Sequence, residues 1–463
     1  MRRAGQAARA TSLAMGLAEW AHDLQPARTD LDLADRALLD TVAVALAARD
    51  HPVARLAAGL SEGARWAVAG HVLDFDDLHM ESTTHVSAVC VPTALATGGG
   101  ARGYLAAAGV MARLGMALGW PHYSAGWHAT CTAGAPASAA GAAVALGLSA
   151  RQIATAIALA VPGAGGVQRA FGTDAKSLQV GFAVETGIRA ARLAAAGAQA
   201  DPSALDAWLS LVGGDPAALD LAGVPAVADL TDPATAPAGP DLTAPAGLGP
   251  DAAADPAVVA AAAPDLAPPA SRNPTEHGPA VPGGLAIKLY PCCYALQRPI
   301  SALAELVTAG DLDPGQVSRI VLRTPEATVT PLIHHRPDTG LQGKFSLEYA
   351  AAAALLDRYP GFASFSDEAV RRPTARRLAG LVEIKLDPGG SWLLDGVLEA
   401  AVYTVDGGIK TVSQQFPPGS PARPPTEAQL RAKLADCVAG LDINPGSWAW
   451  DNAAQVLRDG LLP

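Results

Sequence analysis

The chain has 463 residues and a formal net charge of −11, and half of its residues are hydrophobic. This length is too great for one small core and predicts two or three domains of a soluble globular protein. The negative charge argues against a broad nucleic-acid or anionic-membrane surface, so an acidic ligand would need a local basic pocket.

The N-terminal segment and the cysteines indicate the compartment. Residues 1–24 include Glu19 and Asp23, which predict an amphipathic first helix rather than a signal peptide. We interpret the uncharged Ala/Gly/Ser-rich run at about 125–150 as a tightly packed buried helix rather than a membrane span. The odd cysteine number without a CxxC pair argues against a disulfide framework or zinc site and predicts a cytoplasmic protein; the cysteines are Cys90, Cys131, Cys292, Cys293 and Cys437.

Helical patterns continue from residue 10 to about 200. Residues 29–50 repeat apolar residues at intervals of three and four, and residues 147–160 open with a capping box formed by Ser149 and Gln152. Residues 176–198 predict another helix, in which glycines permit close packing. We therefore expect residues 1–200 to form the first part of a helical domain.

The composition changes after residue 200. Residues 201–284 are rich in Ala, Pro, Asp and Gly, and we expect an insert and linker there, since this composition buries little apolar surface. Residues 285–418 predict a smaller α+β domain, because a helix pattern at 344–359 lies among strand patterns at 317–324, 381–388 and 398–416. The last of these contains a DGG turn typical of a hairpin.

The C-terminal residues 419–463 return to helical patterns. Residues 424–440 begin with prolines and a capping box formed by Thr426 and Gln429. If this tail packs on the first domain, that domain is built from both ends of the chain. The predicted fold class is mainly α with an α+β part, in which a large helical domain carries an inserted α+β lid.

The stretch HVLDFDDLHMESTTH (71–85) is unusually polar for this chain. In a helix, Asp74, Asp77 and Glu81 would share one face, while Asp76 would point elsewhere. One interpretation is a magnesium site that loosely resembles the aspartate-rich helix of isoprenoid synthases, although no second acidic motif is found. A second is a solvated acidic helix end. A third is a proton-transfer pair in which Asp74 orients a base such as His85.

Two histidines lie in GWPHYSAGWHATCTAG (119–134), among small and aromatic residues. A lone histidine on an apolar face is usually a hydrogen-bonded core residue, and this holds for His122 and His128 alike. The polar residues after His128, however, begin an apolar helix, whose N-terminus favours an anion. Both interpretations of His128 stay open at this point.

Lysine is scarce, so a lysine within a polar motif is a candidate functional residue. Lys176 follows a Gly turn at a predicted helix start, Lys288 lies beside Pro and two cysteines, and Lys344 opens KFSLEY. The adjacent Cys292 and Cys293 are a poor metal or disulfide site, because neighbouring side chains diverge. We expect the remaining lysines to lie on the surface; they are Lys385, Lys410 and Lys433.

Five blocks together resemble one family, MmgE/PrpD, which contains 2-methylcitrate dehydratase, cis-aconitate decarboxylase and iminodisuccinate epimerase. The form HYSAGWHATCT is particularly similar to the epimerase branch. The blocks, in the order expected of the family, are HVLDFDDLH…H (71–85), AGWHATCTAG (125–134), FGTDAKSLQVGFAVETG (171–187), KLYPCCYALQRPISA (288–302) and TGLQGKFSLEYA (339–350).

The resemblance implies a homodimer with its active site between the helical domain and the lid, and it implies neither a metal nor an organic cofactor. It implies catalytic roles for Asp74, His85, His128 and Lys176. The substrate-binding positions that it implies are Lys288, Cys293 and Lys344. The expected substrate is a small polycarboxylate, which loses a proton next to a carboxylate.

The chain departs from the family pattern at several polar positions. Leu78 stands where the family usually has Thr or Ser, and Gln179 stands where a His is common. Gln297 and Ser301 replace a common His and Asp. These changes leave the reaction open among dehydration, epimerisation of an amino- or imino-dicarboxylate, decarboxylation of cis-aconitate, and carboxylate binding without turnover.

Overall fold

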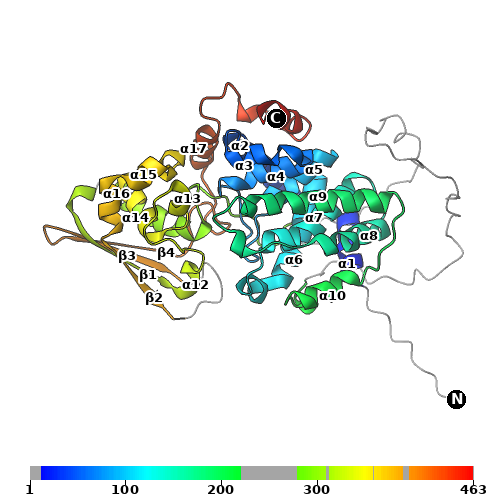
Figure 1. Cartoon of the computed structure of the whole chain (residues 1–463), viewed down its shortest axis with the longest axis horizontal. Coiled ribbons are helices and arrows are strands. Elements are labelled where there is room, and N and C mark those ends of the chain that lie inside the picture. Colours follow the sequence, from blue (N-terminus) through cyan, green and yellow to red (C-terminus); the bar gives the residue numbers. More distant parts are fainter. Residues whose placement is uncertain (1–11, 220–278, 309–311, 358, 389–395, 462–463) are drawn as a thin grey trace, which may run out of the picture.

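The computed structural model describes residues 12–219, 279–308, 312–357, 359–388 and 396–461. Within them the protein has a large helical part and a smaller part in which helices cover a sheet (Figure 1). The predicted fold class, mainly α with an α+β part, is confirmed. Much of the predicted insert, residues 220–278, lies outside the described residues.

Ten helices lie within residues 12–219. Ser12 caps the first of them by accepting from the backbone N–H of Met15, and Ser149 and Gln152 form the predicted capping box of the eighth. The helices are α1 (Leu13–Asp23), α2 (Arg28–Ala47), α3 (Pro52–Leu56), α4 (Glu62–Val72), α5 (Ser87–Thr97), α6 (Gly100–Ser124), α7 (Ala129–Ala145), α8 (Ala150–Ala160), α9 (Ala175–Ala195) and α10 (Ala204–Leu211).

Small residues let the central helices approach closely. α7 is buried along almost its whole length, in keeping with the packed helix expected in the uncharged run. A Cβ atom at Gly187 of α9 would lie 2.4 Å from Cβ of Ser138 in α7. A Cβ atom at Gly141 of α7 would lie 2.6 Å from Cβ of Ala107 in α6. Glycine at these two crossings therefore sets the distance between the helices.

The smaller part contains a four-stranded sheet in the order β2-β1-β3-β4. β1 pairs with β2 in parallel and with β3 antiparallel, and β3 and β4 form the hairpin expected from the DGG turn, where Gly407 has φ +87°. Arg319 pairs with Glu383 on the exposed face. The strands are β1 (Val317–Pro325), β2 (Val382–Asp387), β3 (Leu398–Thr404) and β4 (Ile409–Gln414).

Helices cover the other face of this sheet (Figure 1). Ile320 of β1 and Val402 of β3 are buried in one apolar cluster with Ile300 of α11 and Ala351 of α14. The helices of this part are α11 (Gln297–Thr308), α12 (Glu326–Val329), α13 (Gly340–Gly343), α14 (Leu347–Leu356), α15 (Asp367–Arg371) and α16 (Pro373–Ala379).

The C-terminal helices α17 (Glu427–Cys437) and α18 (Ala453–Gly460) return to α2. Cys437 and Leu457 belong to the same apolar core as the helices of residues 12–219. α10, which begins inside the predicted insert, also joins that core through Leu205 and Trp208. The domain boundaries at residues 200, 284 and 418 remain a prediction.

Two expectations about the polar stretch and the lysines are wrong. Residues 73–86 do not continue α4 but form a loop, because Asp74 and Thr83 adopt positive φ angles of 56° and 55°. Lys433 is not a surface residue but is completely buried. None of the described helices combines the length and apolarity that a bilayer crossing requires.

Candidate active site

Buried lysines hold the backbone at the start of the loop 73–86. Three consecutive carbonyl oxygens each accept a hydrogen bond from a different lysine amine, and these lysines come from the segment before α11, the end of α13 and α17. The contacts are Lys344 Nζ to Leu73 O at 2.5 Å, Lys288 Nζ to Asp74 O at 2.9 Å, and Lys433 Nζ to Phe75 O at 2.8 Å. The smaller part and the C-terminal helix therefore meet the helical part at this loop.

The Asp74 carboxylate joins cations from both parts of the protein. Its Oδ1 atom accepts from Nζ of Lys176, in α9, at 2.8 Å and from Nζ of Lys288 at 3.1 Å. Burial favours the neutral acid, but the two ammonium groups outweigh it and hold the pKa of Asp74 well below its usual range. Asp74 is therefore a fixed anion that keeps two amines side by side, and it is a poor proton acceptor.

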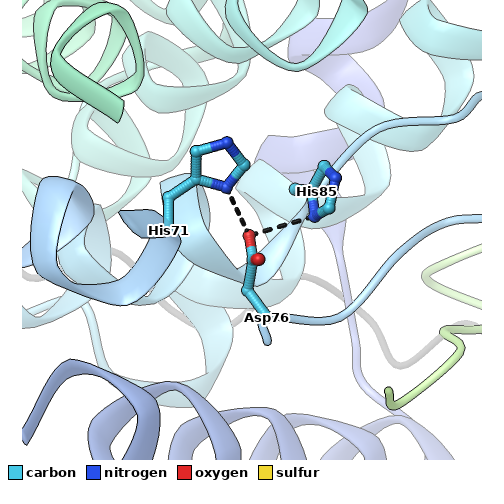
Figure 2. Close-up of side chains that lie close together, drawn as sticks. All are labelled: His71, Asp76 and His85. Atoms are coloured by element: carbon cyan, nitrogen blue, oxygen red, sulfur yellow. Dashed lines mark hydrogen bonds and ion pairs between the residues drawn. The ribbon is translucent and has the colours of Figure 1, made fainter. Parts of the chain in front are cut away.

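Asp76, not Asp74, contacts the imidazole of His85. Figure 2 shows Asp76 between His71 and His85, with one carboxylate oxygen facing both rings. His71 Nδ1 donates to Asp76 Oδ2 at 2.7 Å. His85 Nδ1 lies 3.0 Å from the same oxygen, close enough for an ion pair although off the line of a good hydrogen bond. The predicted pairing of Asp74 with His85 is therefore wrong, because the loop turns where a helix was expected.

The state of the Asp76 pair follows from its burial and its partners. Burial would raise the pKa of Asp76, but His85 and His71 outweigh it and hold that pKa well below its ordinary value. His71 is completely buried, and burial lowers its pKa to about 4. Asp76 is therefore an ionised carboxylate at neutral pH, and His71 is a neutral donor to it.

His128 lies at the N-cap position of α7. Its Nδ1 atom is 2.7 Å from Nε2 of Gln179 and 3.3 Å from Sγ of Cys131. The edge of Phe171 packs against its ring at a centroid distance of 5.0 Å. Burial is the main cause that lowers the pKa of His128 well below its ordinary value, and the neighbouring imidazole of His71 adds to the shift. His128 is consequently a neutral imidazole whose Nδ1 edge is occupied.

One small cavity gathers most of the residues expected in the site. Its volume of about 40 Å³ has room for roughly three water molecules. Six expected site residues line it, together with aromatic and apolar side chains from both parts of the protein. The expected ones are Asp74, His85, His128, Lys176, Lys288 and Cys293, and the others include Leu78, Tyr123, Phe171, Tyr294 and Phe345.

The seventh expected residue, Lys344, lies behind this lining. It is buried, and its amine donates to the Leu73 carbonyl oxygen. Burial lowers the pKa of Lys344 to about 8, although Asp74 opposes this shift. At neutral pH Lys344 is therefore mostly a cation, although its pKa lies only slightly higher. Its amine contacts the carbonyl group of Leu73, the residue before Asp74.

The other polar residues of the two motifs have structural partners. His122 contacts the Val212 carbonyl oxygen at 2.8 Å and Thr132 Oγ1 at 2.9 Å, as expected of a hydrogen-bonded core histidine. Asp77 accepts from the backbone N–H and the hydroxyl of Ser87. Glu81 is exposed. The acidic face that a magnesium cradle would need is therefore not formed.

The residues that sequence reasoning missed are His71, Asp76, Gln179, Tyr123 and Lys433. Helical spacing points Asp76 away from the other acids, whereas the loop brings it to His71 and His85. The surface position expected for Lys433 is wrong because α17, although strongly polar, buries this one lysine. Gln179 was noted only as a departure from the family pattern, yet it contacts His128. The scarcity of lysine in the chain is the one feature of the sequence that could have indicated a special role for Lys433.

One group of described residues has the donor set for a metal ion. The ligand atoms of His71, Asp76 and His85 lie within 4.8 Å of one another. Two imidazoles and a carboxylate suit zinc or iron. Both Nδ1 atoms, however, lie 2.7 and 3.0 Å from a single oxygen, which are distances of direct N–H to carboxylate contact. We therefore interpret the group as a carboxylate that orients two imidazoles.

Comparison with known families finds two matches in the chain. Residues 64–208 match the MmgE/PrpD N-terminal domain, and residues 290–443 match the MmgE/PrpD C-terminal domain. The chain belongs to the MmgE/PrpD family. Membership of MmgE/PrpD supports an enzyme of a general dehydratase or lyase type. No curated protein matches the chain.

Proposed function

We propose that this MmgE/PrpD protein is a cofactor-independent lyase that acts on a small polycarboxylate, as 2-methylcitrate dehydratase does. The observation that carries the proposal is the convergence of Lys176 and Lys288 on one carboxylate oxygen, at 2.8 and 3.1 Å, within the cavity lined by His85 and His128. A pair of amines beside two imidazoles suits a substrate that carries carboxylates and a removable proton.

The proposed chemistry begins with a weakly acidic C–H group next to a carboxylate. Removal of this proton places negative charge on the carboxylate oxygens, and cationic donors such as Lys176 and Lys288 stabilise that charge. His85 takes the proton at Nε2, since its Nδ1 atom faces Asp76. The electron pair then forms the carbon–carbon double bond. The neighbouring hydroxyl, which accepts a hydrogen bond from His128, takes the proton that His85 removed and leaves as water, so both imidazoles end neutral.

Substrate binding requires the two parts of the protein to separate and close again. A polycarboxylate has many more non-hydrogen atoms than the roughly three water molecules for which the cavity has room. Lys176 belongs to α9 of the helical part, whereas Lys288 belongs to the segment that leads to α11. In the proposal, the smaller part is a lid that carries Lys288, Cys293 and Lys344 to the substrate.

A second candidate is an epimerase of an amino- or imino-dicarboxylate. It is favoured by the HYSAGWHATCT form of residues 122–132. It would use the same lysine clamp, Lys176 and Lys288, to hold the substrate carboxylates. The proton then returns to the opposite face of the carbon, from an imidazole other than the one that removed it. Decarboxylation of cis-aconitate, and carboxylate binding without turnover, remain as further outcomes of the same site.

The remaining proposals concern the setting of the enzyme. We propose a homodimer, because Phe182 and Leu193 of α9 are about half exposed (50% and 47%) and would be covered by a partner copy. We propose a cytoplasmic location because the odd cysteine number without a CxxC pair favours a reducing compartment. Light scattering of the purified protein measures its mass and would contradict the dimer if it gave that of a single chain. Activity that survives exhaustive chelation is expected of an enzyme without a metal.

Calorimetric titration tests the clamp without requiring turnover. Tricarballylate carries three carboxylates and no hydroxyl, so it can bind but cannot be dehydrated. We expect Lys176→Met and Lys288→Met each to weaken its binding by about 10- to 100-fold, because each removes a charge-assisted contact worth about 1.5–3 kcal/mol. Lys385→Met, at an exposed position of β2, is the matched control and should bind as the wild type does. Equal affinity in all four proteins would refute the clamp.

A further inference from the structure

The orientation of the Gln179 amide is fixed by the backbone of Val167. Gln179 Oε1 accepts from the Val167 N–H at 3.0 Å, and Gln179 Nε2 lies 3.4 Å from the Val167 carbonyl oxygen. In the opposite orientation the amide NH₂ group would face the Val167 N–H, and the amide oxygen would face the Val167 carbonyl oxygen. Neither pair can form a hydrogen bond. The NH₂ group of Gln179 therefore faces His128, where Nε2 lies 2.7 Å from His128 Nδ1.

An amide NH₂ group only donates, so His128 Nδ1 has to be the acceptor. A second donor acts on the same atom, since Cys131 Sγ lies 3.3 Å away. Burial raises the pKa of Cys131 far above its ordinary value, so its sulfur carries a hydrogen. With two donors at Nδ1, the hydrogen of the neutral ring is at Nε2, and His128 is one of the residues that line the cavity.

The groups around His128 also disfavour its protonation. The Lys176 ammonium and the imidazoles of His71 and His85 all lower the pKa of His128, and Asp76 opposes them. Phe171, which packs on the ring, brings no charge. The ring also stands at the N-terminus of α7, which is electropositive. The ring is therefore expected to be neutral at neutral pH, where the hydrogen bonds at Nδ1 decide its tautomer.

We propose that Gln179 is a positioning residue that fixes His128 as a neutral imidazole with its hydrogen on Nε2. The two cavity histidines then differ in role: Asp76 at Nδ1 leaves His85 a lone pair at Nε2, whereas Gln179 at Nδ1 leaves His128 an N–H donor at Nε2. His128 donates a hydrogen bond from Nε2 to the departing hydroxyl, and His85 accepts the carbon proton and passes it to that hydroxyl. This division of labour rests on the proposed function, but the tautomer itself does not.

Nitrogen NMR of histidine-labelled protein tests the tautomer directly. A bare ring nitrogen and one that carries hydrogen have well-separated ¹⁵N shifts, and the chain has only ten histidines. The His128 signals are assigned as those lost in His128→Asn. We expect a bare Nδ1 and a protonated Nε2 at neutral pH in the wild type. Hydrogen on Nδ1 of His128 in the wild type would overturn the proposal.

Two variants separate positioning from simple packing. Gln179→Glu replaces the donor by a carboxylate of the same shape, so it should move the hydrogen to Nδ1 and make His128 easier to protonate. Gln179→Met removes the donor without adding charge and should give a mixture of both tautomers. Gln152→Glu, in the exposed cap of α8, is the control for an added charge and should leave the His128 signals unchanged.

Kinetics on the substrate that turns over give the functional readout. We expect Gln179→Glu to lower kcat by about 10- to 100-fold with little change in KM, because the neutral His128 ring then presents a bare Nε2 and not an N–H to the departing hydroxyl. The pH profile should also shift, because His128 becomes easier to protonate. Unchanged ¹⁵N signals in folded Gln179→Glu would refute the positioning role. If the ¹⁵N signals show the expected tautomers but no substrate is turned over, the positioning role of Gln179 stands and the proposed function is refuted.

Discussion

At the residue scale, three carboxylates within four residues have three different surroundings. Asp74 contacts two lysine amines, Asp76 lies between two imidazoles, and Asp77 contacts only Ser87 among the described residues. Cations hold the pKa of the first two well below its ordinary value. Burial raises the pKa of Asp77 to about 7 against the ordinary value of 3.8. Each charge state therefore follows from partners that are distant in sequence.

Asp77 predicts a specific dependence of stability on pH. Its folded-state pKa lies above the unfolded value, so between pH 4 and 7, roughly, the folded protein holds a proton that the unfolded chain releases. This group therefore makes stability fall as pH rises through that window, by up to about 1.4 kcal/mol per pH unit, and adds no further change above it.

Asp77→Asn lacks this proton and should lack this slope. Chemical unfolding at several pH values between 4 and 8 gives the unfolding free energy of the variant and of the wild type. The change of their difference with pH measures the contribution of Asp77. We expect the difference to shift in favour of Asn as pH rises towards 7. Asp442→Asn, at an exposed position, should show no such trend. A constant difference for Asp77→Asn would mean that Asp77 is ionised in the folded protein.

The resemblance in sequence was informative about which residues meet but not about how they pair. Asp74, His85, His128, Lys176, Lys288 and Cys293 all line one cavity. The pairing of His85 was wrong because it depended on helical spacing, whereas Asp74 at φ +56° turns the chain. The role of Gln179 could not be read from sequence, because it depends on the Val167 backbone, twelve residues away, to orient an amide.

At the element scale, local patterns predicted the helices and strands well. The expected strands at 317–324, 381–388 and 398–416 correspond to β1, β2 and the β3–β4 hairpin. The polar stretch was the exception, since its acids are stabilised in a loop by lysines from other elements. Periodicity reports the solvent-facing side of an element, and it fails where buried charges replace apolar side chains.

α17 carries one of these buried charges. Lys433 Nζ lies 2.6 Å from Asp40 Oδ1 of α2, donates to the Phe75 carbonyl oxygen and sits 4.1 Å from the centre of the Phe75 ring. The pair joins the C-terminal helix to the helical part directly beneath the site loop. Asp40 Oδ2 has no hydrogen-bond partner among the described residues. Burial raises the pKa of Asp40, and Lys433 is the main group that opposes this rise and so favours the ionised carboxylate.

Lys433→Met should destabilise the protein by about 3–5 kcal/mol, because it leaves a buried carboxylate without its cation. Denaturant unfolding measures the loss, and Lys385→Met on β2 is expected to stay within about 0.5 kcal/mol of the wild type. The double variant Asp40→Asn with Lys433→Met should recover part of the stability, since it removes the unpaired charge. A double variant less stable than Lys433→Met alone would show that the lysine acts in some other way.

At the scale of the whole molecule, two apolar cores meet at the loop 73–86. One core contains the helices of both chain ends, and the other contains the sheet with its helices. Leu78 joins the second core, while Phe75 joins the first. Isolated β-bridge pairing of Leu78 with Ala286 adds a backbone connection. The loop therefore connects the two parts, and a movement of one part relative to the other would change the positions of the amines and imidazoles in the cavity.

The division of the chain into these two cores was accessible from composition, because the strand patterns are confined to residues after the Pro-rich segment. The point at which the two cores meet could not be predicted from composition. It depends on buried lysines whose partners are backbone carbonyl oxygens, and no spacing in the sequence identifies such partners. The family resemblance provided the expected position of the site between the two parts.

Proton NMR in D₂O tests most directly the proposal that this protein removes a proton next to a carboxylate. The wild type is incubated in turn with 2-methylcitrate, citrate, cis-aconitate and an amino- or imino-dicarboxylate, and the His85→Asn variant is the matched control. For a dehydratase we expect the wild type to convert one of these acids to an alkene with loss of water, and for an epimerase we expect it to introduce deuterium next to a carboxylate without loss of water. We expect His85→Asn to lose either activity. A folded wild-type protein that neither converts any of these acids nor exchanges a proton in them would contradict the proposed function.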